Sequence, residues 1–374
     1  MRHRVVVLAV ALVAAAPAFA AAPNVVAHSY VVENGADGDI LLASHDRARL
    51  PMASITKLMT VLLAVQHTKP SDVVTVSADA AAVGESTTTP PLRVGERLTV
   101  LELVKAALIQ SANDAAYALA DYVGRGHVSR FVAMMNAKAR ALGLDDTHFA
   151  RPDGLDAAGH YSSADDVTRL ARIVMKIPLV RSIVMRQTDT ISGGRVLHTW
   201  NDLLGAYPGL IGVKTGHTSL AGWSEVAAAR RDGVTVYATI LGSSSRSERN
   251  VDLAKLLTYG LSRYRWVAVI RKSRVYAWAK APYGRDSLAL VVPRRVVRVV
   301  RFDRPLTERV VAAYVVSLPV VEGQRLGEVR VYDRGKVIAR SPLLASRAIE
   351  KPGTIDRIEW YAGRTVDRVW SWVS

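Results

Sequence analysis

The chain has 374 residues and half of them are apolar, so it can bury a full hydrophobic core and is long enough for two domains. It contains no cysteine, which excludes disulfide bonds and thiol catalysis. Its formal net charge of +16 is unevenly spread, because residues 263–374 carry 23 Lys and Arg against 10 Asp and Glu.

The first twenty residues, MRHRVVVLAVALVAAAPAFA, have the pattern of a secretory signal peptide (residues 1–20). Arg2 and Arg4 precede an apolar run that ends at Ala16, and Ala18-Phe19-Ala20 is a small-residue cleavage signal. The apolar run has 12 residues, fewer than the roughly 20 that a membrane-spanning helix needs. We therefore expect an exported protein rather than one anchored by this segment.

After this leader the pattern changes from strands to helices. Apolar runs on both sides of the Gly- and Asx-rich turn 34–38 predict two strands, and a helix is expected from about Ser54 to His67. The apolar spacing of residues 68–200 predicts a mostly helical section, in which Ser163 is an N-cap.

Strand patterns return after this section. Asp232-Gly233 between two β-prone runs predicts a hairpin, and a helix that ends near Arg263 closes this part of the chain. Strands at both ends with helices between them indicate one antiparallel sheet with an inserted helical subdomain. The predicted fold class is therefore α+β, and residues 21–263 are expected to form one domain.

The C-terminal part divides again. Residues 268–348 are short alternating runs and turns, which predict a small all-β domain. Residues 354–374 carry charges throughout and predict an amphipathic helix that lies on a bilayer, with a helix packed on the β domain as the alternative. The apolar stripe of this helix consists of Ile355, Ile358, Ala362, Val366, Val369, Trp370 and Val373.

The basic excess of this C-terminal part suggests a partner. An exported chain meets anionic lipid headgroups first, so we expect an anionic membrane surface and no nucleic acid, and a merely well-solvated face is the alternative. The nine histidines show no metal-binding spacing of the H-E-x-x-H type, so we expect neither a metal nor another cofactor.

A serine and a lysine stand three positions apart in the stretch MASITKLMT. One helical turn places Ser54 and Lys57 on the same face, where an uncharged lysine could take the proton of the serine hydroxyl. Burial among apolar neighbours would lower the lysine pKa enough for this role. On its own the pair is weak evidence, because an N-cap serine followed by a solvated lysine has the same spacing.

Two further stretches strengthen the assignment. Ser111-Ala112-Asn113 lies in the helical section, and Lys214-Thr215-Gly216 precedes the predicted hairpin. They match the S-x-N and K-T-G elements that accompany S-x-x-K in penicillin-binding proteins and serine β-lactamases. The three motifs occur in the right order, and each falls where the predicted fold requires it.

With these motifs on one chain, the sequence resembles the low-molecular-mass penicillin-binding proteins of the D-alanyl-D-alanine carboxypeptidase family. The similarity extends over nearly all of the chain after the leader and includes the stretches PMASITKLMT, SANDAAYALAD, ALGLDDTHF and GVKTGHTSLAGW. The order of the parts is also similar: signal peptide, catalytic domain, small β domain and amphipathic C-terminal anchor. The resemblance implies a β-lactamase-like fold and a peripheral protein on the outer, periplasmic face of the bacterial cytoplasmic membrane.

The resemblance also implies an acylation mechanism. Ser54 would attack the carbonyl between two terminal D-alanines of a peptidoglycan stem peptide, with Lys57 as the general base. Ser111 would relay the proton to the leaving D-alanine, and Asn113 would hold a substrate amide and orient Lys57. Water would hydrolyse the acyl-enzyme, whereas β-lactam antibiotics would act as covalent inhibitors.

The third motif is implied to bind the substrate. Lys214 would supply positive charge to Ser111 and to the substrate carboxylate, and Thr215, followed by Gly216, would hydrogen-bond that carboxylate. The backbone N–H groups of Ser54 and His217 would form the oxyanion hole. Pairing of two copies as a homodimer on the membrane is left open.

Two positions depart from the family pattern. Thr199-Trp200-Asn201 stands where some members have an arginine that helps to bind the terminal carboxylate. In this chain Arg246, Arg249 or Lys214 alone would bind that carboxylate instead. Asp153 stands where some members have histidine, which leaves the peptide preference and the rate of deacylation open.

Other functions fit the same motifs. A DD-endopeptidase or a β-lactamase would use the same triad of motifs, and a non-catalytic wall-binding or membrane scaffold could keep the fold. A class A β-lactamase deacylates through a glutamate. Glu85 is the candidate here, and its loop context favours an ordinary surface position.

Overall fold

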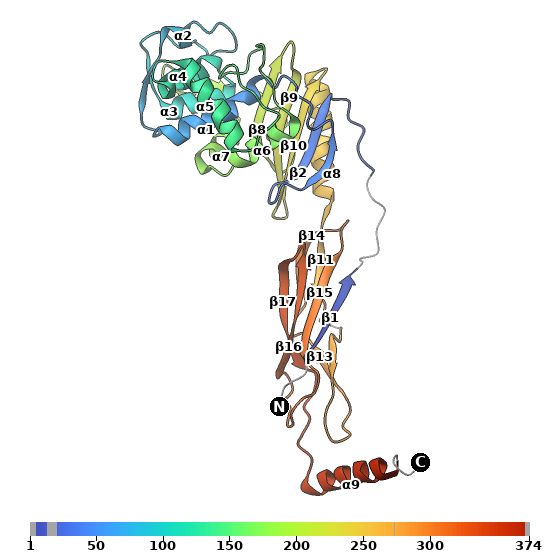
Figure 1. Ribbon diagram of the computed structural model, residues 1–374. Coiled ribbons are helices and arrows are strands. Elements are labelled where there is room, and N and C mark those ends of the chain that lie inside the picture. The colour runs from blue at the N-terminus through green and yellow to red at the C-terminus, as the bar shows by residue number, and fades with distance from the viewer. Residues whose placement is uncertain (1–4, 13–20, 273, 371–374) are drawn as a thin grey trace. The chain divides into compact units, whose positions relative to one another are not determined.

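The computed structural model describes residues 5–12, 21–272 and 274–370 (Figure 1). It divides into two compact units, one within residues 20–262 and the other formed by residues 263–374 and the segment before residue 20. Each unit has its own hydrophobic core. Two cores agree with the size of the chain, which exceeds that of a typical single domain.

A five-stranded antiparallel sheet forms the centre of the first unit, in the order β3-β2-β10-β9-β8. Its strands are β2 (Ser29–Asn34), β3 (Ile40–Ser44), β8 (Leu210–Thr218), β9 (Gly222–Arg231) and β10 (Val234–Ser243). Because β2 pairs with β10, segments from before and after the helical section meet in one sheet. The predicted α+β class is confirmed, and β9 and β10 form the predicted hairpin around Asp232-Gly233.

Helices pack on both faces of this sheet. On one face lies α8 (Arg246–Ser262), where a Cβ added to Gly260 would come within 2.6 Å of Val236. On the other lies α6 (Ala164–Val174), where the Thr168 hydroxyl is 2.5 Å from that of Thr239. Side chains alternate along a strand, so Val236 and Thr239 of β10 face opposite sides. The predicted N-cap is present, because the Ser163 hydroxyl accepts a hydrogen bond from the Asp166 N–H.

The section between β3 and β8 is mainly helical, as the apolar spacing predicted. Its helices are α1 (Lys57–His67), α2 (Ala78–Ala81), α3 (Val100–Lys105), the π-helical turn η2 (Ala106–Gln110), α4 (Asn113–Gly124), α5 (Val128–Ala141), α6 and α7 (Pro178–Val184). It also holds two strand pairs that the sequence did not indicate, β4 (Val73–Thr75) with β5 (Arg97–Thr99) and β6 (Thr188–Ile191) with β7 (Arg195–His198). Strands of three or four residues are too short to show a clear alternation.

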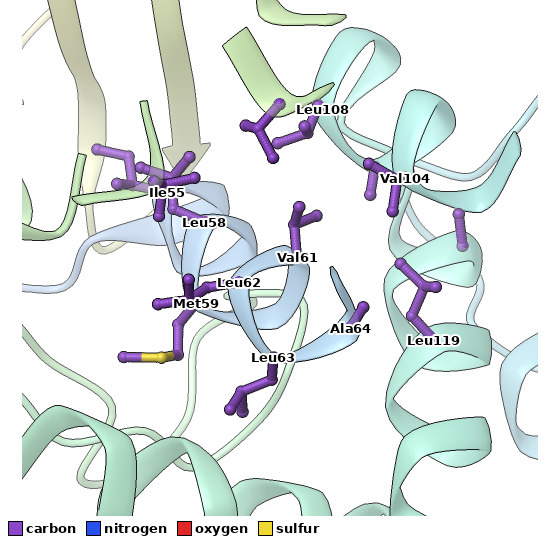
Figure 2. Packing of buried hydrophobic residues seen from close by; sticks show 14 of the residues in the cluster. Ile55, Leu58, Met59, Val61, Leu62, Leu63, Ala64, Val104, Leu108 and Leu119 are labelled. Atoms are coloured by element: carbon purple, nitrogen blue, oxygen red, sulfur yellow. The ribbon is translucent and has the colours of Figure 1, made fainter. Parts of the chain in front are cut away.

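Helix α1 lies at the centre of the helical section (Figure 2). Its residues from Lys57 to Ala64 are all buried, whereas a surface helix buries only one stripe. Val61 and Leu62 pack in the same apolar cluster as Leu119 of α4. An ammonium group on such a helix is therefore withdrawn from solvent.

The second unit is built mainly from β-strands in its described part. Its six-stranded antiparallel sheet has the order β1-β15-β16-β17-β13-β12, and β11 pairs with β14. The strands are β1 (Val5–Leu12), β11 (Tyr264–Ile270), β12 (Ala277–Ala279), β13 (Leu288–Val291), β14 (Val296–Arg301), β15 (Leu306–Ala313), β16 (Arg325–Asp333) and β17 (Lys336–Ala345). The turn between β16 and β17 is Arg334-Gly335, inside the predicted Asp333-Arg334-Gly335 turn.

Part of the predicted signal peptide appears as a strand. The segment Val5–Leu12 pairs antiparallel with β15, from Val5 opposite Ala313 to Leu12 opposite Leu306. Residues 1–4 and 13–20, which include the basic start and the predicted cleavage signal, lie outside the described residues. Removal of the leader would take β1 away from β15.

The chain continues into α9 (Thr354–Trp370), the predicted amphipathic helix, and its last four residues lie outside the described part. Trp360 contacts the ring of Tyr283 at 5.3 Å, but Ile355 and Ile358 are 72% and 63% exposed. The start of the apolar stripe therefore faces solvent. Within residues 5–12, 21–272 and 274–370, no helix combines the length and the apolar character that crossing a membrane requires.

Candidate active site

Ser54 lies in a short 3₁₀ turn, η1 (Ala53–Thr56), directly before α1, and not in the α-helix that the sequence predicted to begin there. The preceding residue, Ala53, has a positive φ of 50°, a conformation that is uncommon for a residue with a side chain. Thr56 holds this turn, because its hydroxyl donates to the Ala53 carbonyl at 2.8 Å. His160 supports Thr56 in turn, with its Nε2 2.8 Å from the same hydroxyl oxygen.

A glycine from a distant loop completes the support of this turn. Gly154 has a φ of 91°, and a Cβ there would fall 2.0 Å from the Ala53 carbonyl oxygen. Only a residue without a side chain fits this position. Burial lowers the pKa of the adjacent His160 to about 4, so its ring is neutral at physiological pH. The Ala150 N–H donates to its Nδ1, which leaves the Nε2 proton for Thr56.

Lys57 is fully buried and makes three hydrogen bonds through its Nζ. The acceptors are Ser54 Oγ at 2.7 Å, Asn113 Oδ1 at 2.6 Å and the Asp153 carbonyl oxygen at 2.7 Å. Burial lowers the pKa of Lys57 to about 7, although the nearby carboxylates of Asp153 and Asp114 oppose this shift. A lysine with such a pKa is partly uncharged at neutral pH and can accept a proton.

Ser111 and Lys214 form a second serine–lysine pair. Ser111 follows the π-helical turn η2 and takes a left-handed conformation with a φ of 66°. The Nζ of Lys214 donates to its hydroxyl at 2.8 Å. Burial, followed by the charge of Lys57, holds the pKa of Lys214 well below its usual range.

Asn113 joins the lysine to the loop on the other side of the site. While its Oδ1 accepts from Lys57, its Nδ2 donates to the Glu85 carbonyl and its backbone N–H to the Ser86 carbonyl, both at 2.8 Å. The next residue, Asp114, accepts from the backbone N–H groups of Thr88 and Leu92. Glu85 is an exposed loop residue, as its sequence context predicted.

Strand β8 forms the other wall of the site. Gly216 lies so close to η1 that a Cβ there would meet Met52 O at 2.9 Å and Ser54 N at 3.2 Å. Thr215 and His217 flank it on the same strand, and the His217 ring lies 4.0 Å from that of Trp223. A cavity of about 240 Å³ opens between these elements. It is lined by Ser54, Ser86, Gln110, Ser111, Trp200, Thr215, Gly216, His217, Trp223 and Arg249.

Charged groups lie behind this cavity. Arg249 is almost fully buried and forms ion pairs with Glu225 at 3.2 Å and Asp202 at 3.4 Å. In the described part of the chain, neither oxygen of Glu225 receives a hydrogen bond, and burial raises its pKa to about 7. The sequence pointed to Arg249 but not to Glu225, although a carboxylate inside the apolar run of β9 is an unusual feature.

The structure therefore brings the three motifs together. Ser54, Lys57 and Asn113 form one hydrogen-bonded chain, and Ser111 with Lys214 forms another beside the same cavity. Sequence reasoning missed His160 and the Arg151 guanidinium, which binds the Asp153 carboxylate with distances of 2.6 and 2.9 Å. Spacing along the chain gives no indication of either contact.

Comparisons with known proteins identify the family of this chain. Residues 16–245 match peptidase family S11, described as D-alanyl-D-alanine carboxypeptidase. The chain is 31% identical to the D-alanyl-D-alanine carboxypeptidase DacF of Bacillus subtilis, over 85% of this chain and 84% of that protein. It is 31% identical to DacD of Salmonella typhimurium, over 95% and 94%.

Solved structures give the same result. The crystal structure of penicillin-binding protein 5 from Haemophilus influenzae superposes with a TM-score of 0.63 at 26% identity, covering 88% of this chain and 99% of that one. The matched family region contains all three motifs. The chain belongs to the D-alanyl-D-alanine carboxypeptidase family of serine peptidases, as the resemblance of its motifs predicted.

Proposed function

We propose that this carboxypeptidase removes the terminal D-alanine from peptidoglycan stem pentapeptides through an acyl-enzyme on Ser54. The observation that carries this proposal is the contact of 2.7 Å between Ser54 Oγ and the buried Nζ of Lys57. Uncharged Lys57 takes the hydroxyl proton as Ser54 Oγ bonds to the carbonyl carbon between the two D-alanines. β-Lactams acylate the same Ser54 Oγ, but their leaving group stays attached to the acyl-enzyme because it belongs to the opened ring.

The second serine–lysine pair serves the leaving group. When the C–N bond breaks, the departing amine needs a proton, and Ser111 is placed to relay it with support from Lys214 at 2.8 Å. Lys214 also contributes positive charge beside Thr215, which binds the substrate carboxylate. Water then attacks the acyl carbon and releases the shortened peptide.

The oxyanion hole consists of the backbone N–H groups of Ser54 and His217. The close packing of Gly216 on η1 supports this role, because it brings the two backbone segments together. Donors of this kind are each worth roughly 3 to 4 kcal/mol of the activation barrier. Asn113 orients Lys57 and binds an amide of the stem peptide.

The experiment that tests the function uses the full chain with two substrates. Incubation with labelled penicillin should attach one label to each protein molecule, and a stem pentapeptide that ends in D-Ala-D-Ala should release free D-alanine. Labelling without D-alanine release would favour an endopeptidase or a scaffold. Rapid loss of the label would indicate a β-lactamase instead.

The substrate carboxylate is assigned to Arg249 rather than Arg246. Both arginines contact Asp202, but Arg249 lines the cavity that contains Ser54 and Thr215, whereas Arg246 lines the neighbouring cavity. Arg249 therefore takes the place of the arginine that some relatives carry at the position of Trp200.

Replacing Arg249 with glutamine should strongly reduce the preference for a peptide with a free C-terminal carboxylate over its C-terminal amide, and Thr215 should preserve the remainder. A charge-assisted hydrogen bond of this kind is worth about 1.5 to 3 kcal/mol, or roughly 10- to 100-fold in kcat/KM. The matched variant is Arg246→Gln. If Arg246→Gln loses the preference and Arg249→Gln keeps it, Arg246 binds the carboxylate instead. A double variant, Arg249→Gln with Glu225→Gln, serves as a control because it does not leave the Glu225 carboxylate buried without its partner.

The proposal extends to the remaining parts of the chain and to the membrane. We propose that residues 1–20 direct export, that residues 21–263 are the catalytic domain and that residues 268–348 form the β domain before an anchor helix at 354–374. The exposed Ile355 and Ile358 of α9 and the basic excess of residues 263–374 support peripheral binding to anionic lipid on the outer face.

Deleting residues 354–374 should move the protein from sedimenting anionic vesicles to the supernatant without changing penicillin labelling. The helix contributes the apolar area that enters the bilayer, and the catalytic cavity lies in the other compact unit. Ile355→Asn combined with Ile358→Asn should weaken sedimentation in the same direction. Full-length protein that stays in solution with these vesicles would contradict the anchor.

A further inference from the structure

Trp200 occupies an exposed but fixed position beside the active site. Trp200 is 52% exposed, yet its Nε1–H donates a hydrogen bond to the Gln110 carbonyl at 3.0 Å. The Arg246 guanidinium lies over its ring, 5.4 Å from the centroid, and Arg246 is itself held by Asp202. An indole held at both its edge and its face keeps one orientation.

Two cavities meet at this indole. The first is the catalytic cavity of about 240 Å³, and the second has a volume of about 570 Å³. Trp200 and Gln110 line both of them. The second cavity is otherwise lined by Thr89, Gly194, Val196, His198, Thr199 and Arg246. Trp200 therefore acts as a partition between the site of acylation and a larger groove.

The partition stands at the end of the site where the leaving residue is bound. This orientation rests on the proposed function, in which Thr215 and Arg249 bind the carboxylate of that residue. Arg249 and Trp200 line the first cavity, and Arg246, one helical turn before Arg249, lines the second. With the carboxylate bound by Thr215 and Arg249, a side chain that continues from the first cavity toward the second has to pass the indole, and the methyl group of D-alanine is too short to reach that far.

We propose that Trp200 is a specificity-determining residue that restricts the leaving group to D-alanine and so excludes cross-linked stem peptides. In a cross-link, the D-alanine carbonyl is joined to an amine on a second stem. When that amine belongs to meso-diaminopimelate, the leaving centre carries a carboxylate, like D-alanine, and a long side chain that continues into the second peptide.

The chemical step would be the same for both substrates. Ser54 Oγ bonds to the D-alanine carbonyl carbon, the C–N bond breaks, and the departing amine takes the proton. Water then cleaves the ester. The second cavity offers polar groups, Thr89, His198 and Thr199, along which a departing peptide could lie once the indole no longer blocks the path.

The test compares Trp200→Ala and Trp200→Phe with the full-length wild type on two probes. One probe is a stem pentapeptide, and the other is a muropeptide dimer cross-linked through meso-diaminopimelate. For Trp200→Ala, the ratio of dimer cleavage to D-alanine release should rise about tenfold or more, the scale on which a pocket discriminates by size. Trp200→Phe keeps most of the wall and should show a much smaller rise.

Two further variants show whether the second cavity is responsible. Val196 lines that cavity and is 48% exposed, so Val196→Trp can fill the space, and adding it to Trp200→Ala should remove the gain. Trp266→Ala, at an exposed tryptophan of the other compact unit, should leave the ratio at the wild-type value.

The outcomes separate this inference from the proposed function. An unchanged ratio in Trp200→Ala, or a wild type that cleaves the dimer as fast as the pentapeptide, would overturn the role of Trp200 while leaving D-alanine release intact. Failure of the wild type to release D-alanine or to bind penicillin would instead contradict the proposed function.

Discussion

Replacing Ser54 with alanine is expected to abolish covalent labelling by penicillin and to lower D-alanine release by about 10⁴-fold or more, because loss of the nucleophile removes the acyl-enzyme route. The variant should fold, since Ser54 Oγ contributes one of three hydrogen bonds to Lys57 and the other two remain. A hydrogen bond of this kind contributes about 1 kcal/mol to the free energy of unfolding.

Intact-protein mass spectrometry after incubation with a β-lactam is the direct measurement. The adduct should appear on the wild type and on Ser182→Ala, a control at an exposed helical serine outside the cavity, and should be missing from Ser54→Ala. An adduct that persists in Ser54→Ala would mean that another hydroxyl, with Ser111 the nearest candidate, is the nucleophile.

The motif residues could be predicted from the sequence because their chemistry is local and ordered. S-x-x-K places Ser54 and Lys57 one turn apart, and the order of the later motifs indicated an α+β fold that would bring Ser111 and Lys214 beside them. The structure has Lys214 2.8 Å from Ser111 and Lys57 2.7 Å from Ser54. Each of these contacts joins residues that the motifs name.

The support of the nucleophile could not be predicted in the same way. Ser54 lies in a 3₁₀ turn after a residue with positive φ, and this conformation depends on Gly154 and His160, about a hundred positions away. Helical periodicity at the start of α1 gives no indication of the turn. Contacts between distant loops are set by tertiary packing, which local patterns do not encode.

The electrostatics of the site could also be predicted only in part. Burial of Lys57 was expected from its apolar neighbours on α1. The ion pair of Arg151 with Asp153, whose carbonyl accepts from Lys57, and the pairing of Glu225 with Arg249 are given only by the structure. A charge in the sequence does not reveal which opposite charge will neutralise it.

Lys57→Gln should slow acylation of Ser54 by about 10²- to 10⁴-fold, the usual contribution of a general base. Glutamine can still reach the neighbouring polar groups, but it cannot accept the serine proton. The rate of penicillin labelling, measured over a range of pH, is the readout. Lys69→Gln, at an exposed lysine outside the site, should behave as the wild type.

The pH dependence identifies which amine acts as the base. The pKa of Lys57 is lowered to about 7, so its uncharged fraction, and with it the wild-type rate, should fall about tenfold per pH unit below 7. Asp153 and Asp114 favour the charged lysine, while Arg151 disfavours it, and the charges of Lys57 and Lys214 repel each other. Lys57→Gln should therefore lose this acidic limb. If Lys57→Gln keeps both the wild-type rate and the fall in rate below pH 7, then Lys214, the other buried amine beside a serine, removes the proton instead.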